Sequence, residues 1–204
     1  MSDDPRLAAL GAFTPEGTLT PGHGDSYLFF VGRDDCHGIM HTLIPAETLL
    51  FKFNQFGYDD DELNDDITAL MHNPNVRVQA TCDSSQAGGV HERKILADDL
   101  ANDPAFYNSF AVGQSATHQI SHTKGGICVG QGVGFEGSMN WSGSGEGTGI
   151  FLRGGKQAPG YKAQNNTLLV STNPVFLARF SARLDTEHIT AMQQQAAKAK
   201  KGTP

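Results

Sequence analysis

A histidine and a lysine two residues apart are the residues of this sequence whose types and spacing best suit chemistry. His122 and Lys124 lie in residues 117–124, a stretch whose composition favours extended chain. Side chains at positions i and i+2 of a strand project from the same face, so the imidazole and the ammonium group are expected to share one pocket. An imidazole serves as a nucleophile or proton carrier, and an ammonium group attracts anions.

A second polar segment, residues 137–142, reads GSMNWS. Ser138 and Asn140 place small hydrogen-bonding groups on a turn that begins with glycine, which permits close approach to an anionic oxygen. Together with His122 and Lys124, these groups suit the binding and attack of a phosphoryl centre.

Other polar residues have simpler explanations. His118 precedes His122 by four residues, but no third ligand at convincing spacing accompanies the pair, so we predict neither a metal site nor a cofactor. The acidic run at 59–66 is explained better by a helix start with a solvated face than by a cation site. His91 and Glu92 fit a surface helix better than a pocket wall.

The elements that must position the chemistry follow from apolar periodicity and turn residues. Strands are predicted at residues 27–31, 49–53, 76–82, 127–129, 133–135 and 167–171, with extended chain at 112 and 117–124. Helices are predicted after Asp34 or Asp35, at 59–71, after 89, and as two helices after Pro174. The strand–helix–strand unit at 49–82 favours an α/β fold, with a mixed, mostly parallel sheet flanked by helices.

The length of 204 residues fits one domain. We expect a flexible, Pro- and Gly-containing arm at 1–26, a folded domain at 27–197 and a basic, disordered tail at 198–204. Three cysteines match neither a zinc site nor a disulfide scaffold, and we expect them to be unpaired thiols. No apolar run has the length of a signal peptide or membrane span, so the protein is expected to be soluble and cytoplasmic, without stable membrane association.

The net charge of −7 counts modestly against a strong binder of duplex nucleic acid. A local basic cleft is still compatible with it, because Arg153, Lys156 and Lys162 follow the main motif closely.

The order of HTK at 122–124 and GSMN at 137–140 resembles the single-motif branch of the phospholipase D superfamily. That motif reads H-x-K, four residues, D, six residues, G-S, with Asn two residues after the Ser. The resemblance spans roughly residues 45–181 and implies an α-β-α sandwich. The family's Asp position falls on Val129 or Gly130, so this Asp is absent. A supporting Glu falls near Asn166, and Glu146 is the alternative support for the histidine.

The resemblance implies a metal-independent phosphodiesterase that works through a phosphohistidine on His122. Lys124 and Asn140 are the other expected catalytic residues. The expected substrate-binding residues are Ser138, Trp141, Ser142, Glu146 and Asn166, although Trp141 also suits simple packing. A homodimer would place two motifs in one shared active site.

Small single-motif members of the superfamily are largely nucleases, so DNA or RNA is the first substrate class. The alternatives are a hydrolase of phospholipids or small phosphodiesters and a catalytically inactive binding module. The missing Asp and Glu motivate the inactive module, whereas the intact His122, Lys124, Ser138 and Asn140 oppose it.

Overall fold

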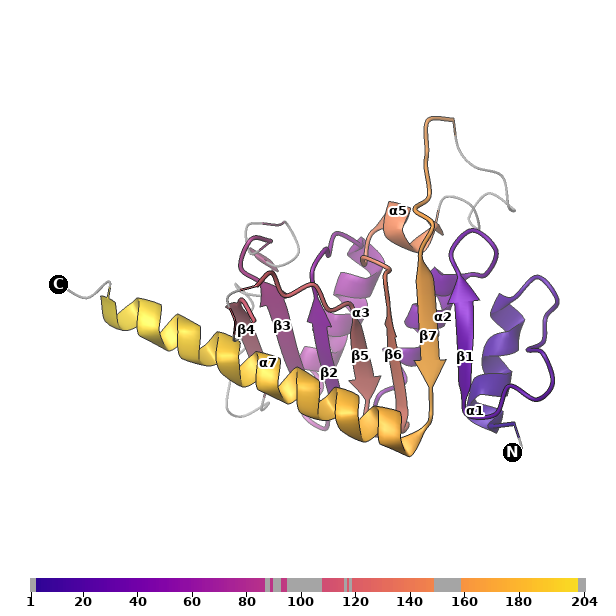
Figure 1. The fold of residues 1–204 in the computed structure, drawn as a ribbon, viewed down its shortest axis with the longest axis horizontal. Coiled ribbons are helices and arrows are strands. Elements are labelled where there is room, and N and C mark those ends of the chain that lie inside the picture. Colours follow the sequence, from indigo (N-terminus) through magenta and orange to yellow (C-terminus); the bar gives the residue numbers. More distant parts are fainter. Residues whose placement is uncertain are drawn as a thin grey trace.

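The computed structural model describes residues 3–86, 89, 93–94, 108–115, 117, 119–148 and 159–201. A seven-stranded sheet in the order β1-β7-β6-β5-β2-β3-β4 forms its centre, with helices on both faces (Figure 1). The strands are β1 (Ser26–Phe30), β2 (Leu50–Gln55), β3 (Arg77–Asp83), β4 (Ser109–Gly113), β5 (Gly125–Cys128), β6 (Val133–Gly137) and β7 (Thr167–Ser171). The helices are α1 (Pro5–Ala8), η1 (Ala9–Phe13), α2 (Cys36–Leu43), α3 (Asp61–Met71), α5 (Gly143–Glu146) and α7 (Pro174–Lys201).

The mixed α/β sheet flanked by helices confirms the predicted fold class. Parallel pairing joins β2 to β3 and β3 to β4. The other four pairings among the described strands are antiparallel, so parallel strands do not predominate as expected. For one of these four pairings the reason is local: β5 and β6 are joined by a short turn at 129–132, and a connection of that length can join only antiparallel neighbours.

Helix α3 connects the parallel strands β2 and β3, as its sequence pattern predicts. Asp60 caps the helix, because its carboxylate accepts a hydrogen bond of 2.7 Å from the backbone amide of Leu63. Leu63 and Ile67 are fully buried and give the helix its apolar face. Helix α2 begins in the same way, with Asp35 accepting a bond of 2.9 Å from the amide of Gly38.

Helix α7 is one continuous helix where the sequence suggested two. No glycine or proline interrupts residues 175–201, so nothing in that stretch forces a break. Asp185, interpreted as the start of a second helix, instead binds Lys52 on β2 at 2.7 Å. His188 likewise bonds Thr81 on β3 at 2.9 Å. These side chains fix α7 against the face of the sheet that it crosses in Figure 1.

The N-terminal segment differs from the expected flexible arm. Its described part contains α1 and η1, and the side chains of Leu7 and Leu10 are buried in the hydrophobic core. At the other end, α7 continues to Lys201 and so enters the predicted tail. Within the described residues, none of the helices combines the length and apolar character needed to cross a bilayer. The helix predicted after residue 89 lies almost entirely outside the described residues.

Candidate active site

The two polar segments found in the sequence lie at one edge of the sheet, where β2 and β3 end and β5 and β7 begin (Figure 1). His122 and Lys124 directly precede β5, so they lie just outside the strand on which their side chains were expected to share a face. The ladder continues past the strand end, since the amide of Gly137 donates to the carbonyl of Lys124 at 3.1 Å. This pairing brings the HTK segment next to the turn at 137–142.

Lys124 is a buried cation at this edge. Its side chain belongs to a residue only 4% exposed, and its Nζ donates to the carbonyl oxygen of His122 at 3.0 Å. The same atom lies 5.1 Å from the centre of the Phe56 ring. Among the described residues no carboxylate forms an ion pair with it, which agrees with the absence of the motif Asp. Burial lowers the pKa of Lys124 to about 8, so its charge is poorly compensated and suited to receiving an anion.

His122 is exposed beside Lys124, and its ring centre lies 4.5 Å from that of Phe56. Partial desolvation and the positive charge of Lys124 lower the pKa of His122, while Asp83 opposes the shift. The imidazole is therefore mostly neutral near pH 7, which is the state that a nucleophile requires.

Buried polar side chains form hydrogen bonds with the HTK segment and with Ser121 before it. The sequence alone did not predict these contacts. Asp83, at the end of β3, accepts a hydrogen bond of 2.6 Å from the amide of Ser121. Asn54 on β2 donates to the Ser121 hydroxyl at 2.9 Å. Glu187 on α7 accepts from the hydroxyl of Thr123 at 3.2 Å, between the two catalytic candidates. The sequence gives one local indication of these supports: Asp83 and Asn54 are polar residues at or near the ends of apolar strands.

The turn at 137–142 presents Ser138 and Asn140. The Ser138 hydroxyl donates to the Oδ1 of Asn166 and accepts the amide of Thr167, both at 3.1 Å. Gly57 makes room for Asn140, because a Cβ at Gly57 would lie 2.9 Å from the Asn140 Cγ. The Oδ1 of Asn140 is buried without a hydrogen-bond partner in the described part of the chain. A hollow of about 400 Å³ opens beside this turn.

The hollow is lined in part by Asn140 and Ser142, but His122 and Lys124 are not among its lining residues. The Ser142 hydroxyl caps α5 by accepting the amide of Gly145 at 3.1 Å, so it is already engaged. Trp141 is only 1% exposed and packs against Phe53 and Tyr58. The expectation that Trp141 contacts substrate is corrected: its ring is part of the core.

The expected support for His122 from Glu146 or Asn166 is not what the structure contains. The carboxylate of Glu146 is fully buried and binds the Nδ1 of His37 on α2 at 2.6 Å. Asn166 supports Ser138, and its amide donates to the carbonyl of Gly145 at 3.1 Å. His118, His91, Glu92, Arg153 and Lys156 lie outside the described residues.

The fold of this chain is similar to that of solved proteins of the phospholipase D family. Nuc from Salmonella typhimurium, a phospholipase D family member, is 12% identical, with a TM-score of 0.56 over 80% of this chain and 94% of that one. NucT from Helicobacter pylori is 13% identical, with a TM-score of 0.58 over 81% and 96%. Phosphatidylserine synthase from Haemophilus influenzae Rd KW20 is 12% identical, with a TM-score of 0.51 over 78% and 36%. No family model and no curated protein matches the sequence.

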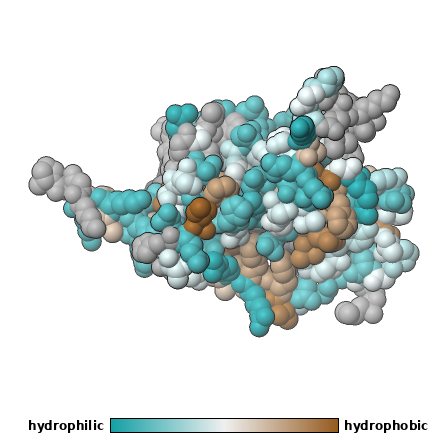
Figure 2. Space-filling model, turned by 45° about the horizontal axis from the view of Figure 1, so that its top comes forward, coloured by the Kyte–Doolittle hydropathy of each residue, from teal (hydrophilic) through white to brown (hydrophobic). Residues whose placement is uncertain are grey.

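The surface toward this edge is largely polar. In Figure 2, with the top of the molecule turned forward, hydrophilic residues make up most of the coloured surface, and hydrophobic atoms gather in a few areas. Lys162 is exposed and the buried ammonium of Lys124 lies at the edge itself. The desolvated positive charge of Lys124 is therefore the electrostatic feature that the described residues give to this edge.

Proposed function

We propose that this protein is a phosphodiesterase of the phospholipase D type that cleaves nucleic acid through a phosphohistidine. The observation that carries the proposal is that exposed His122 and buried Lys124 lie against the same Phe56 ring, and that no carboxylate of the described residues forms an ion pair with Lys124. An anionic phosphodiester would supply the negative charge that balances the ammonium group of Lys124. The phospholipase D-like fold supports the same assignment.

In the proposed reaction, an imidazole nitrogen of His122 attacks phosphorus, and the bond from phosphorus to the leaving oxygen breaks. The leaving oxygen takes a proton from a second histidine. Water then attacks the phosphohistidine and returns a proton to that second histidine, which frees His122 and releases a phosphomonoester. Lys124 and Asn140 stabilise the negative charge that develops on the phosphoryl oxygens.

Each chain contains one HTK segment, so we propose that the second histidine is His122 of a partner copy in a homodimer. This arrangement has a direct test. Excess inactive His122→Ala chain mixed with wild-type chain should form mixed dimers and suppress the activity per wild-type chain. Activity that scales only with the amount of wild-type chain would rule out a shared site.

Nucleic acid is the favoured substrate class because this chain matches nearly the whole length of Nuc and NucT but only about a third of the phosphatidylserine synthase. Small single-motif members of the superfamily are largely nucleases. The net charge of −7 disfavours a duplex, which has the higher charge density, so we expect single strands to be cleaved faster.

The test is cleavage of labelled single-stranded and duplex DNA, RNA and a bis-aryl phosphodiester, with chelator present, by wild-type protein and His122→Ala. We expect cleavage by the wild type and its loss in the variant, with a radiolabelled phosphoprotein trapped by acid-free quenching. Circular dichroism confirms that both proteins are folded. Absence of turnover by folded wild-type protein on nucleic acid, with turnover of lipid phosphodiesters, would favour the lipid alternative. Absence on every substrate would favour an inactive binding module.

A further inference from the structure

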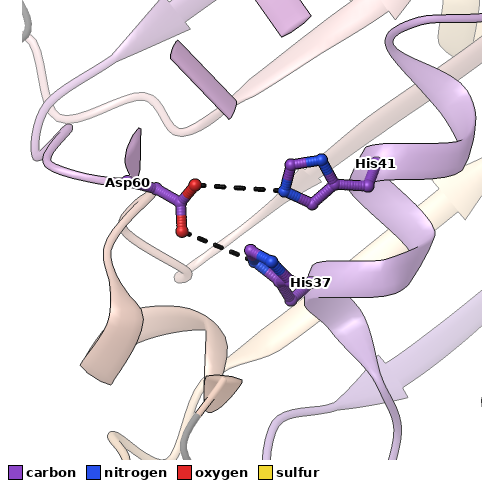
Figure 3. Close-up of side chains that lie close together, drawn as sticks. All are labelled: His37, His41 and Asp60. Atoms are coloured by element: carbon purple, nitrogen blue, oxygen red, sulfur yellow. Dashed lines mark ion pairs between the residues drawn. The ribbon is translucent and has the colours of Figure 1, made fainter. Parts of the chain in front are cut away.

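Two histidines on α2 face the start of α3 and are distant in the sequence from the HTK segment. His37 and His41 are four positions apart, about one helical turn, and so lie on one face of the helix, with ring centres 4.2 Å apart. Figure 3 shows both rings directed toward Asp60, the residue that caps α3. One nitrogen of each ring and one oxygen of Asp60 lie within 4.8 Å of one another.

In each histidine, the Nδ1 atom lies next to a carboxylate oxygen. The Nδ1 of His37 lies 2.6 Å from the Oε2 of Glu146, and the Nδ1 of His41 lies 2.6 Å from the Oδ2 of Asp66. Metal-binding histidines are usually oriented in this way, because a carboxylate on one nitrogen leaves the other nitrogen available to the metal. The hydrogen bond from the Leu63 amide orients Asp60 in turn.

The Nδ1 of His37 also lies 3.5 Å from the Oδ2 of Asp60, so it approaches both carboxylates, and the Nε2 of each ring faces Glu62. The Oε2 of Glu62, an exposed side chain, lies 3.3 Å from the Nε2 of His37 and 3.8 Å from the Nε2 of His41. The Oδ1 of Asp60 lies 3.9 Å from the Nε2 of His41. That Nε2 is buried and has no hydrogen-bond partner among the described residues. The 3.3 Å contact is a hydrogen bond between His37 and Glu62, whereas 3.8 and 3.9 Å exceed hydrogen-bonding distance, so direct contacts leave the Nε2 of His41 unsatisfied.

The spacing suits an ion. Ligand atoms bonded at about 2.0–2.1 Å to a tetrahedral ion lie about 3.4 Å from one another. The separations above run from 3.3 to 3.9 Å, and the atoms of His37, His41 and Asp60 all lie within 4.8 Å, so a small inward movement of the side chains would bring them to an ion. Two imidazole nitrogens with two carboxylate oxygens form a mixed donor set that favours zinc-type transition metals over Ca²⁺ or Mg²⁺, which prefer oxygen alone. An adjoining hollow of about 240 Å³, lined by His37, Asp60 and Glu62, provides access from solvent.

We propose that His37, His41 and Asp60, joined by Glu62 from the solvent side, bind one divalent transition-metal ion of the zinc type. The ion connects α2 to the start of α3 and, through Glu146, to α5. The segments 57–60 and 140–146 are neighbours, because the amide of Trp141 donates to the carbonyl of Gly57 and the amide of Asp59 to that of Trp141, both at 2.8 Å. With four protein ligands the site is structural, and it holds the segments on which Asn140 depends.

The test uses tag-free protein stripped with chelator and then dialysed. Titration with Co²⁺ should give visible absorption bands of a tetrahedral ion that saturate at one equivalent per chain, and Zn²⁺ should displace it. His41→Gln should weaken Co²⁺ binding by about 100-fold or more, and Glu62→Gln by about 10-fold. His122→Ala is the matched control, because it removes a histidine elsewhere and should leave the affinity unchanged.

Absence of saturable binding by folded wild-type protein would overturn the proposal, and would leave a network of protonated histidines and carboxylates. Equal affinity in His41→Gln and the wild type would overturn it as well. If His41→Gln fails to fold, X-ray absorption of the Zn²⁺-loaded wild type decides instead: two histidine ligands support the site, and none contradicts it. These readouts do not depend on turnover, so they stand whether or not the protein cleaves phosphodiesters.

Discussion

His122 and His37 belong to two histidine regions with opposite electrostatic surroundings. Next to His122 is the ammonium group of Lys124, and desolvation together with that charge lowers the histidine's pKa. His37 is itself buried, which alone would lower its pKa, but the hydrogen bond and charge of Glu146, aided by Asp60 and Glu62, raise it to about 9. Neighbouring groups thus set the charge of an imidazole: a lowered pKa suits the proposed nucleophile at the sheet edge, and carboxylates on the other histidine suit a cation or the proposed metal ligand between the helices.

The two regions should differ most in how much their histidines contribute to the rate of cleavage. His122→Ala should lower kcat/KM by at least about 10³-fold, because the proposed nucleophile is lost. His41→Gln should change it by less than about 10-fold, because no reacting atom contacts His41. Initial rates on the preferred diester measure both, with circular dichroism as the control for folding. Similar losses in the two variants would show that the regions are not functionally separate.

Lys124 is the buried cation that only the region of His122 contains. Its replacement should have the next largest effect on the rate. Lys124→Met should lower kcat by about 10²–10³-fold, since a donor to the phosphoryl oxygens is lost. The same variant should be as stable as the wild type or up to about 1–2 kcal/mol more stable, because a poorly compensated buried charge is replaced by an apolar side chain. Urea unfolding measures the stability. A large loss of stability would mean that Lys124 is structural.

The pH dependence of the rate should show the two pKa shifts of the sheet edge. Below the lowered pKa of His122, protonation blocks the nucleophile; above it, His122 of the partner copy loses the proton that the proposed general acid must donate. The rate should fall further above about 8, where Lys124 loses its proton. A plot of kcat/KM against pH should therefore peak near the pKa of His122, fall about 10-fold per unit on either side, and steepen above about 8. Lys124→Arg, which stays protonated, should lose the steeper part. An unchanged steep part in that variant would assign it to another group.

The pH dependence of stability should show the opposite shift in the second region. The pKa of His37 is about 9 when folded and 6.5 as the reference value, so its contribution is complete below 6.5 and is lost as pH rises through 9. In chelator, the free energy of unfolding should fall by about 1–3 kcal/mol over this window. Glu146→Gln should flatten the decline, because it removes the hydrogen-bonding charge that raises the pKa most. Equal slopes in both proteins would contradict this account.

Much of the fold was readable because its signals are local. Alternating apolar residues predict β3, and an acidic cap followed by helical spacing predicts α3, at nearly the observed bounds. The length of α7 was misjudged, since Asp185 looks like a helix start until its partner Lys52 is known. That pairing joins residues distant in the sequence, and local pattern carries no information about it.

The candidate site divides in the same way. Short spacing identified His122, Lys124, Ser138 and Asn140, but the partner of Glu146 could not be inferred. Glu146 and His37 are 109 positions apart and meet only because α2 and α5 pack together. His37 and His41 have a metal-type spacing on their helix, but the third and fourth donors come from α3, which the sequence presented only as a solvated helix start.

The HTK segment is held by Glu187, a residue of the last helix in the chain. Glu187 holds Thr123 across 64 positions of sequence, and Asn54 and Arg183 bind the same carboxylate. During synthesis, strands β2, β3 and β5 emerge from the ribosome well before this anchor. Until α7 emerges and packs on the sheet, the HTK segment lacks the hydrogen bond from Thr123 to Glu187. A nascent chain would therefore complete the proposed active site only when nearly all of the described fold is present.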